Sequence, residues 1–159
     1  MMPGKIRFFT EGINYRLLSK TKIKLWITGI ILNETKTPGD VNIIFCDDVY
    51  LSELNLSYLK HTTLTDIITF DYSDDGIISG DIYISINRVK ENAIQFGKTF
   101  RDELHRVMIH GVLHLLGNKD KKPKDKSMMR KKEDDCLLLL QFFKKVISVR
   151  FNEVVEEKL

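Results

Sequence analysis

Apolar residues recur at helical spacing between residues 19 and 34. They follow an i, i+3, i+4, i+7, i+8 stripe formed by Ile23, Trp26, Ile27, Ile30 and Ile31. A helix with 3.6 residues per turn gathers such positions on one face, so this pattern predicts an amphipathic helix. Residues 36–40, which include Pro38 and Gly39, are expected to break the regular structure that follows.

Short apolar stretches rich in β-branched residues predict four strands, at residues 6–9, 41–46, 66–72 and 80–86. The turn-forming sequence Ser73-Asp74-Asp75-Gly76 separates the last two. Asp47 and Asp48 are expected to cap a helix that continues through Leu59, because aspartate side chains accept hydrogen bonds from free helical N–H groups.

Three further helices are expected, at residues 87–95, at residues 100–116, and from Pro123 to about Lys145. The apolar side of the last helix includes Met129, Cys136, Leu139, Leu140 and Phe143. The tail from about residue 150 is weakly patterned, and we expect it to fray. The chain is therefore predicted to form one α+β domain over residues 1–159, in which about five helices pack on a small mixed four-stranded sheet.

The composition favours an ordinary globular protein and excludes several other classes. Of 159 residues, 43% are hydrophobic and 30% are charged, and no apolar run reaches the ~18 residues that a membrane span needs. The N-terminal residues do not resemble a signal peptide. Cys46 and Cys136 both lie in apolar sequence, so they are expected to be buried thiols, as in a reducing cytoplasm. We expect a cytoplasmic protein with no membrane partner.

The segment His110-Gly111-Val112-Leu113-His114-Leu115-Leu116-Gly117-Asn118-Lys119-Asp120 carries the strongest chemical signal. Histidines four residues apart lie about 40° apart around a helix, so both imidazoles leave the same face. Gly117 suits the left-handed residue that ends a helix, after which Asp120 can approach the histidines. His110, His114 and Asp120 are thus a predicted three-ligand metal site with an open position for water or substrate. The alternative is a pair of histidines at the edge of a core helix.

The same spacing occurs in zinc peptidases with a long histidine motif. In those enzymes a glutamate that acts as the general base follows the first histidine, whereas Gly111 stands there in this chain. A metallopeptidase is therefore the less favoured hydrolase.

Basic residues cluster next to this segment. The net charge is only +3, but eight basic residues lie between residues 119 and 132, against Asp120 and Asp125. An anionic polymer bound there would pass the metal, so Lys119, Lys121, Lys122 and Lys124 are candidate RNA-binding residues. The alternative is a solvated charged face.

The histidine segment resembles the signature of the YbeY family, bacterial metal-dependent endoribonucleases of rRNA maturation. Two further blocks agree with it: Leu54-Asn55, Tyr58 and Thr65-Asp66-Ile67-Ile68-Thr69-Phe70, and then Gly80-Asp81-Ile82 followed by Asn92-Ala93 and Glu103-Leu104. The resemblance covers residues 40–140. It implies one Zn²⁺ per chain and single-stranded RNA as the substrate. It also implies a role in maturation of the 3′ end of small-subunit rRNA and in ribosome quality control, with the small subunit and its assembly factors as partners.

Two positions depart from the family pattern. Asp120 stands where the family usually has a third histidine, and its charge should make a metal-bound water slightly less acidic. Leu59 stands where the family usually has an arginine, which leaves Lys60 as the candidate replacement. The missing arginine favours an alternative, a non-catalytic ribosome-assembly or RNA-binding factor with a structural metal.

Four more residues are candidates around the metal. Glu103 lies two helical turns before His110 and is predicted to orient a histidine or to accept a proton, the alternative being a surface glutamate on a solvated helix. Asp81, Asp66 and Thr65 begin strands and are predicted to support the ligands or the cleft, the alternative being capping or turn roles. His61, His105, Met128 and Met129 are expected to be exposed or packed residues rather than ligands.

Overall fold

The computed structural model describes residues 4–62 and 64–157, with side chains as far as Phe143. Its strands are β1 (Ile6–Thr10), β2 (Thr37–Cys46), β3 (Ile67–Asp71) and β4 (Ile77–Ser85). Its helices are α1 (Lys20–Asn33), α2 (Asp48–Leu54), α3 (Ile86–Gln95), α4 (Phe100–Leu115) and α5 (Pro123–Glu157), and a π-helical turn, η1 (Asn55–Leu59), continues α2. The predicted α+β class is confirmed.

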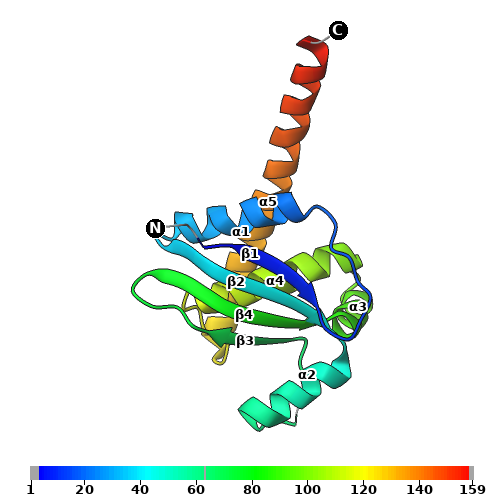
Figure 1. The fold of residues 1–159 in the computed structure, drawn as a ribbon, viewed down its shortest axis with the longest axis vertical. Coiled ribbons are helices and arrows are strands. Elements are labelled where there is room, and N and C mark those ends of the chain that lie inside the picture. Colours follow the sequence, from blue (N-terminus) through cyan, green and yellow to red (C-terminus); the bar gives the residue numbers. More distant parts are fainter. Residues whose placement is uncertain (1–3, 63, 158–159) are drawn as a thin grey trace.

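The four strands form one mixed sheet in the order β1-β2-β4-β3. β2 lies parallel to β1 and to β4, whereas β3 and β4 form an antiparallel hairpin. Helix α1 connects the parallel pair β1 and β2, as parallel neighbours require a crossover (Figure 1).

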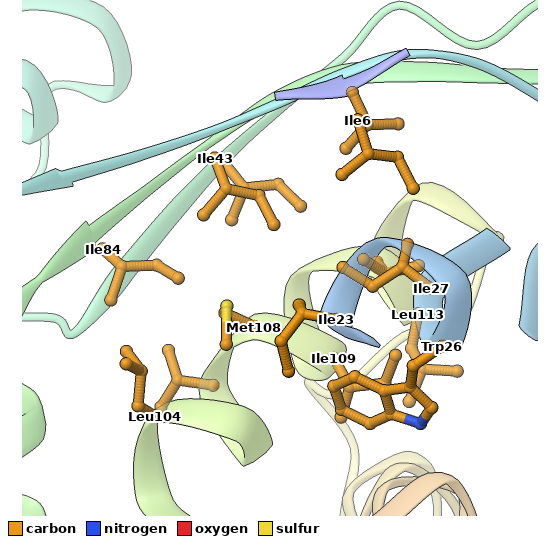
Figure 2. Packing of buried hydrophobic residues seen from close by; sticks show 14 of the residues in the cluster. Ile6, Ile23, Trp26, Ile27, Ile43, Ile84, Leu104, Met108, Ile109 and Leu113 are labelled. Carbon is orange, nitrogen blue, oxygen red and sulfur yellow. The ribbon is translucent and has the colours of Figure 1, made fainter. Parts of the chain in front are cut away.

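The main core lies between one face of the sheet and helices α1 and α4. Figure 2 shows Ile6, Ile43 and Ile84 pointing from three strands toward Trp26 and Ile27 of α1 and Met108 and Ile109 of α4. Helix α5 closes this layer, where the Trp26 Nε1–H donates to the Cys136 carbonyl at 2.8 Å. A smaller cluster on the other sheet face joins Cys46, Leu51 and Ile68.

Several boundaries differ from the predicted ones. β2 begins at Thr37, inside the predicted break, because a register shift between Pro38 and Val41 lets the strand continue past the proline. β4 begins at Ile77, three residues early, and α5 continues to Glu157 instead of ending near Lys145. In that helix Met129 and Leu140 are buried, but Leu139 is 38% exposed, so its predicted place on the apolar side is wrong.

The cysteines are both free, Cys46 buried and Cys136 half-buried. Burial raises the pKa of the Cys46 thiol to about 12 and that of Cys136 to about 11. The prediction of a buried thiol is confirmed for Cys46, whereas Cys136 is only half-buried. Over the residues that the structure describes, no helix combines the length and apolarity needed to cross a membrane.

Candidate metal centre

Helix α4 positions both histidines. Its start is fixed by Thr99, whose Oγ1 accepts from the Asp102 N–H at 3.1 Å, and by acidic residues in its first turn. Its inner side packs so closely on the sheet that a Cβ at Gly111 would lie 2.8 Å from Cγ2 of Ile82. His110 and His114 leave the helix away from this contact and are half-buried.

The end of α4 turns the chain back toward the histidines. Gly117 has φ of +93°, its N–H donates to the His114 carbonyl at 2.9 Å, and the Asn118 N–H donates to the Leu113 carbonyl at 3.0 Å. These paired bonds are the glycine-dependent C-terminal cap that the sequence predicted. The turn leaves Asp120 beside both imidazoles.

Three potential ligand atoms meet at one point. The His110 Nε2 lies 2.9 Å from the His114 Nε2, and the Asp120 Oδ2 lies 3.2 Å from the first and 3.3 Å from the second. Ligands at ~2.0–2.1 Å from a tetrahedral Zn²⁺ are separated by about 3.3 Å, so the triangle fits such an ion. These three residues are the candidate metal group among the described residues.

The outer ring atoms fix how the histidines point. The Nδ1 of His110 lies 2.7 Å from Oε2 of Glu133, and the Nδ1 of His114 lies 2.9 Å from the Asn118 carbonyl oxygen. Both partners only accept hydrogen bonds, so each Nδ1 donates a proton and each Nε2 turns a lone pair toward Asp120. Three electron-rich atoms so close together repel one another unless a cation lies among them, and the donor set therefore fits a metal ion.

Glu133 is buried, with 5% of its surface exposed, and its Oε1 also accepts from Arg106 at 2.9 Å. Burial alone would raise the pKa of Glu133, but the bonds from His110 and Arg106 outweigh it and lower the pKa. Burial lowers the pKa of His110, and the bond to Glu133 with the nearby Asp120 charge more than reverses this. Glu133 is thus held as a carboxylate beside the His110 ring.

A cavity of about 420 Å³ lies beside His110 and Asp120. Its walls come from the strand entry before β3 and from α3, α4 and α5, and the lining residues are Asp66, Asn92, Phe96, Glu103, Arg106, Val107, His110, Asp120, Lys126, Met129, Arg130 and Glu133. Two further carboxylic acids of the lining, Asp66 and Glu103, have a pKa raised mainly by burial. This cavity is the open side of the candidate centre.

The structure brings some of the predicted support residues to this cavity and not others. Asp66 and Glu103 line it, whereas the Thr65 hydroxyl bonds the backbone of Ile67 and serves a turn. The Asp81 carboxylate accepts from Asn42 Nδ2 at 2.9 Å on the other face of the sheet from α4. Its predicted place behind the metal ligands is therefore wrong, since neighbouring strand residues point to opposite faces and Ile82 contacts α4.

The predicted basic residues lie outside the cavity. Lys60 is exposed at the end of η1, with φ of +53°. Lys119, Lys121, Lys122 and Lys124 are exposed on the segment that leads from the end of α4 into α5. Lys132 bonds Oδ1 of Asn118 and so holds the turn. His61 is exposed and His105 is buried against Trp26, as predicted.

Sequence reasoning missed Glu133 and Arg106. Glu133 lies 23 residues after His110 and comes from a different helix, so no local spacing reveals its contact. Met129, 3% exposed, lines the cavity on the same helix. A carboxylate one helical turn after a buried methionine was the available signal, and it is a weak one.

Comparison with known proteins agrees with this site. A family model described as Endoribonuclease YbeY matches residues 11–141. The chain belongs to the YbeY family. Among curated members named Endoribonuclease YbeY, that of Flavobacterium psychrophilum is 53% identical over 122 residues, covering 77% of this chain and 87% of the relative. That of Christiangramia forsetii is 47% identical over 131 residues, covering 82% and 91%.

The YbeY fold also matches a solved structure. The solution structure of TM1509 from Thermotoga maritima aligns with a TM-score of 0.61 at 28% identity, over 89% of this chain and 93% of that one. The match to the family model extends well beyond residues 40–140, where the sequence resemblance was seen.

Proposed function

We propose that this chain is a zinc-dependent endoribonuclease. The observation that carries the proposal is the meeting of His110 Nε2, His114 Nε2 and Asp120 Oδ2 within 3.3 Å in a member of the YbeY family. Curated relatives carry the name endoribonuclease. The cavity lined by His110 and Asp120 gives an RNA phosphodiester access to two of the three ligand residues.

When bound at these ligands, Zn²⁺ would supply a Lewis acid and lower the pKa of a coordinated water toward ~7. The protein's own residues supply the rest of the mechanism. Glu133 and the Asn118 carbonyl hold the two imidazoles in the ligating tautomer. Glu103 Oε atoms in the cavity wall are the candidate proton acceptor, because burial raises the pKa of Glu103 toward the working range of a general base.

The proposed substrate is single-stranded precursor rRNA near the 3′ end of the small-subunit rRNA. Lys119, Lys121, Lys122 and Lys124 would bind its phosphates, and Lys60 would replace the family arginine as a point charge. A role in ribosome quality control, contact with the small subunit and its assembly factors, and a cytoplasmic location belong to the same proposal.

One other function has a specific observation in its favour. Leu59, 43% exposed, occupies the position of the family arginine, which favours a non-catalytic RNA-binding factor with a structural metal. A metallopeptidase has less support, since a glutamate at position 111 would collide with Ile82 and Ile67.

The test compares the wild-type chain with His114→Ala and with His61→Ala, which removes an exposed histidine outside the centre. We expect about one metal per chain and metal-dependent cutting of an rRNA-precursor fragment for the wild type and His61→Ala, and neither for His114→Ala. Cutting by a metal-free variant would point to another nuclease. Loss of stability on chelation without any cutting by the wild type would favour the non-catalytic factor.

A further inference from the structure

The lining of the cavity outside helix α5 carries polar groups that the metal ligands do not use. Arg106 donates hydrogen bonds to Glu133 Oε1 at 2.9 Å and to Asp134 Oδ1 at 2.7 Å. Glu133 in turn accepts from His110. Besides Glu103, the polar lining residues outside α5 that remain are Asp66 and Asn92, and both are half-buried. They form a polar wall beside His110.

One hydrogen bond determines which polar atoms of Asp66 and Asn92 remain available to a ligand. The Asn92 Nδ2 donates to the Asp66 Oδ2 at 3.2 Å, so the amide is oriented with its donor group turned to the carboxylate. The Asn92 Oδ1 accepts no hydrogen bond within the described part of the chain, and this oxygen is accessible to solvent. Two neighbouring residues of the cavity lining therefore offer acceptors, a carboxylate on Asp66 and an amide oxygen on Asn92.

An aromatic ring stands at the edge of the same wall. Phe96 follows Asn92 by one helical turn, and its N–H donates to the Asn92 carbonyl at 2.9 Å, which places both side chains on one side of α3. The ring is 52% exposed although it lines the cavity. Exposed aromatic rings beside a nucleic-acid site are stacking surfaces for unpaired bases.

We propose that Asp66, Asn92 and Phe96 form a subsite that binds an unpaired guanine next to the cleaved phosphate. This inference rests on the proposed endoribonuclease function and adds base selection to it. The Asp66 carboxylate accepts from the N1–H of the base, the Asn92 Oδ1 accepts from its N2 amine, and Phe96 stacks on its face.

The chemistry of the wall selects this ligand over the others. The Asp66 carboxylate repels a phosphate from this part of the lining, whereas Lys126 and Arg130 attract it to the α5 side of the same cavity. Guanine presents two neighbouring donors on its Watson–Crick edge. Uracil presents a single N–H between two carbonyls, and adenine and cytosine each present one amine beside an acceptor. Each of these three bases can therefore donate to only one of the two acceptors on Asp66 and Asn92.

The test measures binding of GMP and IMP to the full zinc-loaded chain by calorimetry. The two nucleotides share their phosphate and differ only in the N2 amine, so the ratio of their dissociation constants reports that contact alone. We expect GMP to bind about fivefold more tightly than IMP. Asn92→Ala should bring this ratio close to one, and Phe96→Ala should weaken both nucleotides by at least about fivefold while keeping the ratio.

Ile94→Ala serves as the matched control, because Ile94 lies on the same helix and is 83% exposed. It should leave both constants unchanged, and circular dichroism checks that each variant is folded. Equal binding of GMP and IMP by the wild type, or an unchanged ratio in Asn92→Ala, would overturn the guanine subsite.

A cleavage assay tests the guanine subsite separately from the proposed endoribonuclease function. RNA oligonucleotides that differ by a single guanine or inosine at the cut site are incubated with the wild type, and the guanine substrate should be cut faster. If RNA is cut without preference and GMP and IMP bind equally, the subsite is wrong and the nuclease stands. If GMP is preferred in binding but no RNA is cut, the nuclease is wrong and the subsite stands.

Discussion

At the residue scale, the geometry of the metal centre depends on Glu133 as much as on the ligands themselves. Its Oε2 holds the Nδ1–H of His110 at 2.7 Å, and its Oε1 is held in turn by Arg106 at 2.9 Å. A buried carboxylate with two such partners has little freedom to move. It therefore fixes the ring orientation and the tautomer of one ligand.

We expect Glu133→Gln to bind zinc about 10- to 100-fold more weakly than the wild type, because a glutamine can present an amide donor to Nδ1 and so favour the tautomer with its proton on Nε2. Competition with a chromophoric chelator measures the affinity. Asp134→Asn is the matched control, since Asp134 pairs with the same Arg106 but is exposed and bonds no histidine among the described residues. Equal zinc affinity in Glu133→Gln and Asp134→Asn would contradict this role.

The residues of the site differ in how far the sequence could predict them. His110, His114 and Asp120 lie within eleven residues, so helical periodicity and one glycine turn are enough to bring them together. Glu133 reaches His110 only because α5 packs across α4, which no local pattern encodes. The face on which Asp81 lies could not be predicted, because the direction of a strand side chain depends on register, and register is a property of the whole sheet.

At the element scale, the close packing of α4 on the sheet determines where the histidines stand. The contact is closest at Gly111, where a Cβ would lie 2.8 Å from Cγ2 of Ile82 and 2.9 Å from Cδ1 of Ile67. Ile82 is fully buried, and its Cγ2 is bonded directly to Cβ, so it cannot yield unless the strand moves. A larger residue would push α4 and its histidines away from the sheet.

We expect Gly111→Ala to lower the free energy of unfolding by about 1–3 kcal/mol, since overpacking outweighs the gain in helix propensity. Gly29→Ala in α1 is the matched control, because its Cβ would meet only Cζ of Phe143, at 4.0 Å. That variant should be more stable than the wild type by up to about 1 kcal/mol. Urea titration of both variants tests the pair, and a Gly111→Ala chain as stable as Gly29→Ala would show that α4 can shift freely.

The elements themselves were largely predictable, and their ends less so. Periodicity places α1 and α4 within a residue or two, because their apolar stripes are long. β2 extends through Pro38 and Gly39, which locally favour a break, since pairing with β4 and the register shift accommodate them. The predicted α5 was too short because the second half of this helix lacks the regular apolar stripe that marks a buried helix.

At the scale of the whole molecule, the metal centre joins parts of the chain that are distant in sequence. His110 and His114 belong to α4, Asp120 to the following turn, and Glu133 to α5. The same α5 is tied to α1 through the bond between Trp26 and the Cys136 carbonyl. An ion bound at these ligands exists only when this packing is formed, so binding and folding stabilise each other.

We therefore expect chelation to lower the thermal midpoint of the wild type. With free metal at about 1,000 times its dissociation constant, binding contributes about 4 kcal/mol, which corresponds to roughly 10 °C for a chain of this length. His114→Ala should melt at the same temperature with and without chelator, and Glu133→Gln should show a smaller shift than the wild type. Melts followed by circular dichroism at matched protein concentration measure all three. An unchanged wild-type midpoint, with metal analysis showing the ion removed, would mean that the three ligand atoms are held together by packing alone, because a bound ion cannot leave a folded state that it stabilises without lowering its stability.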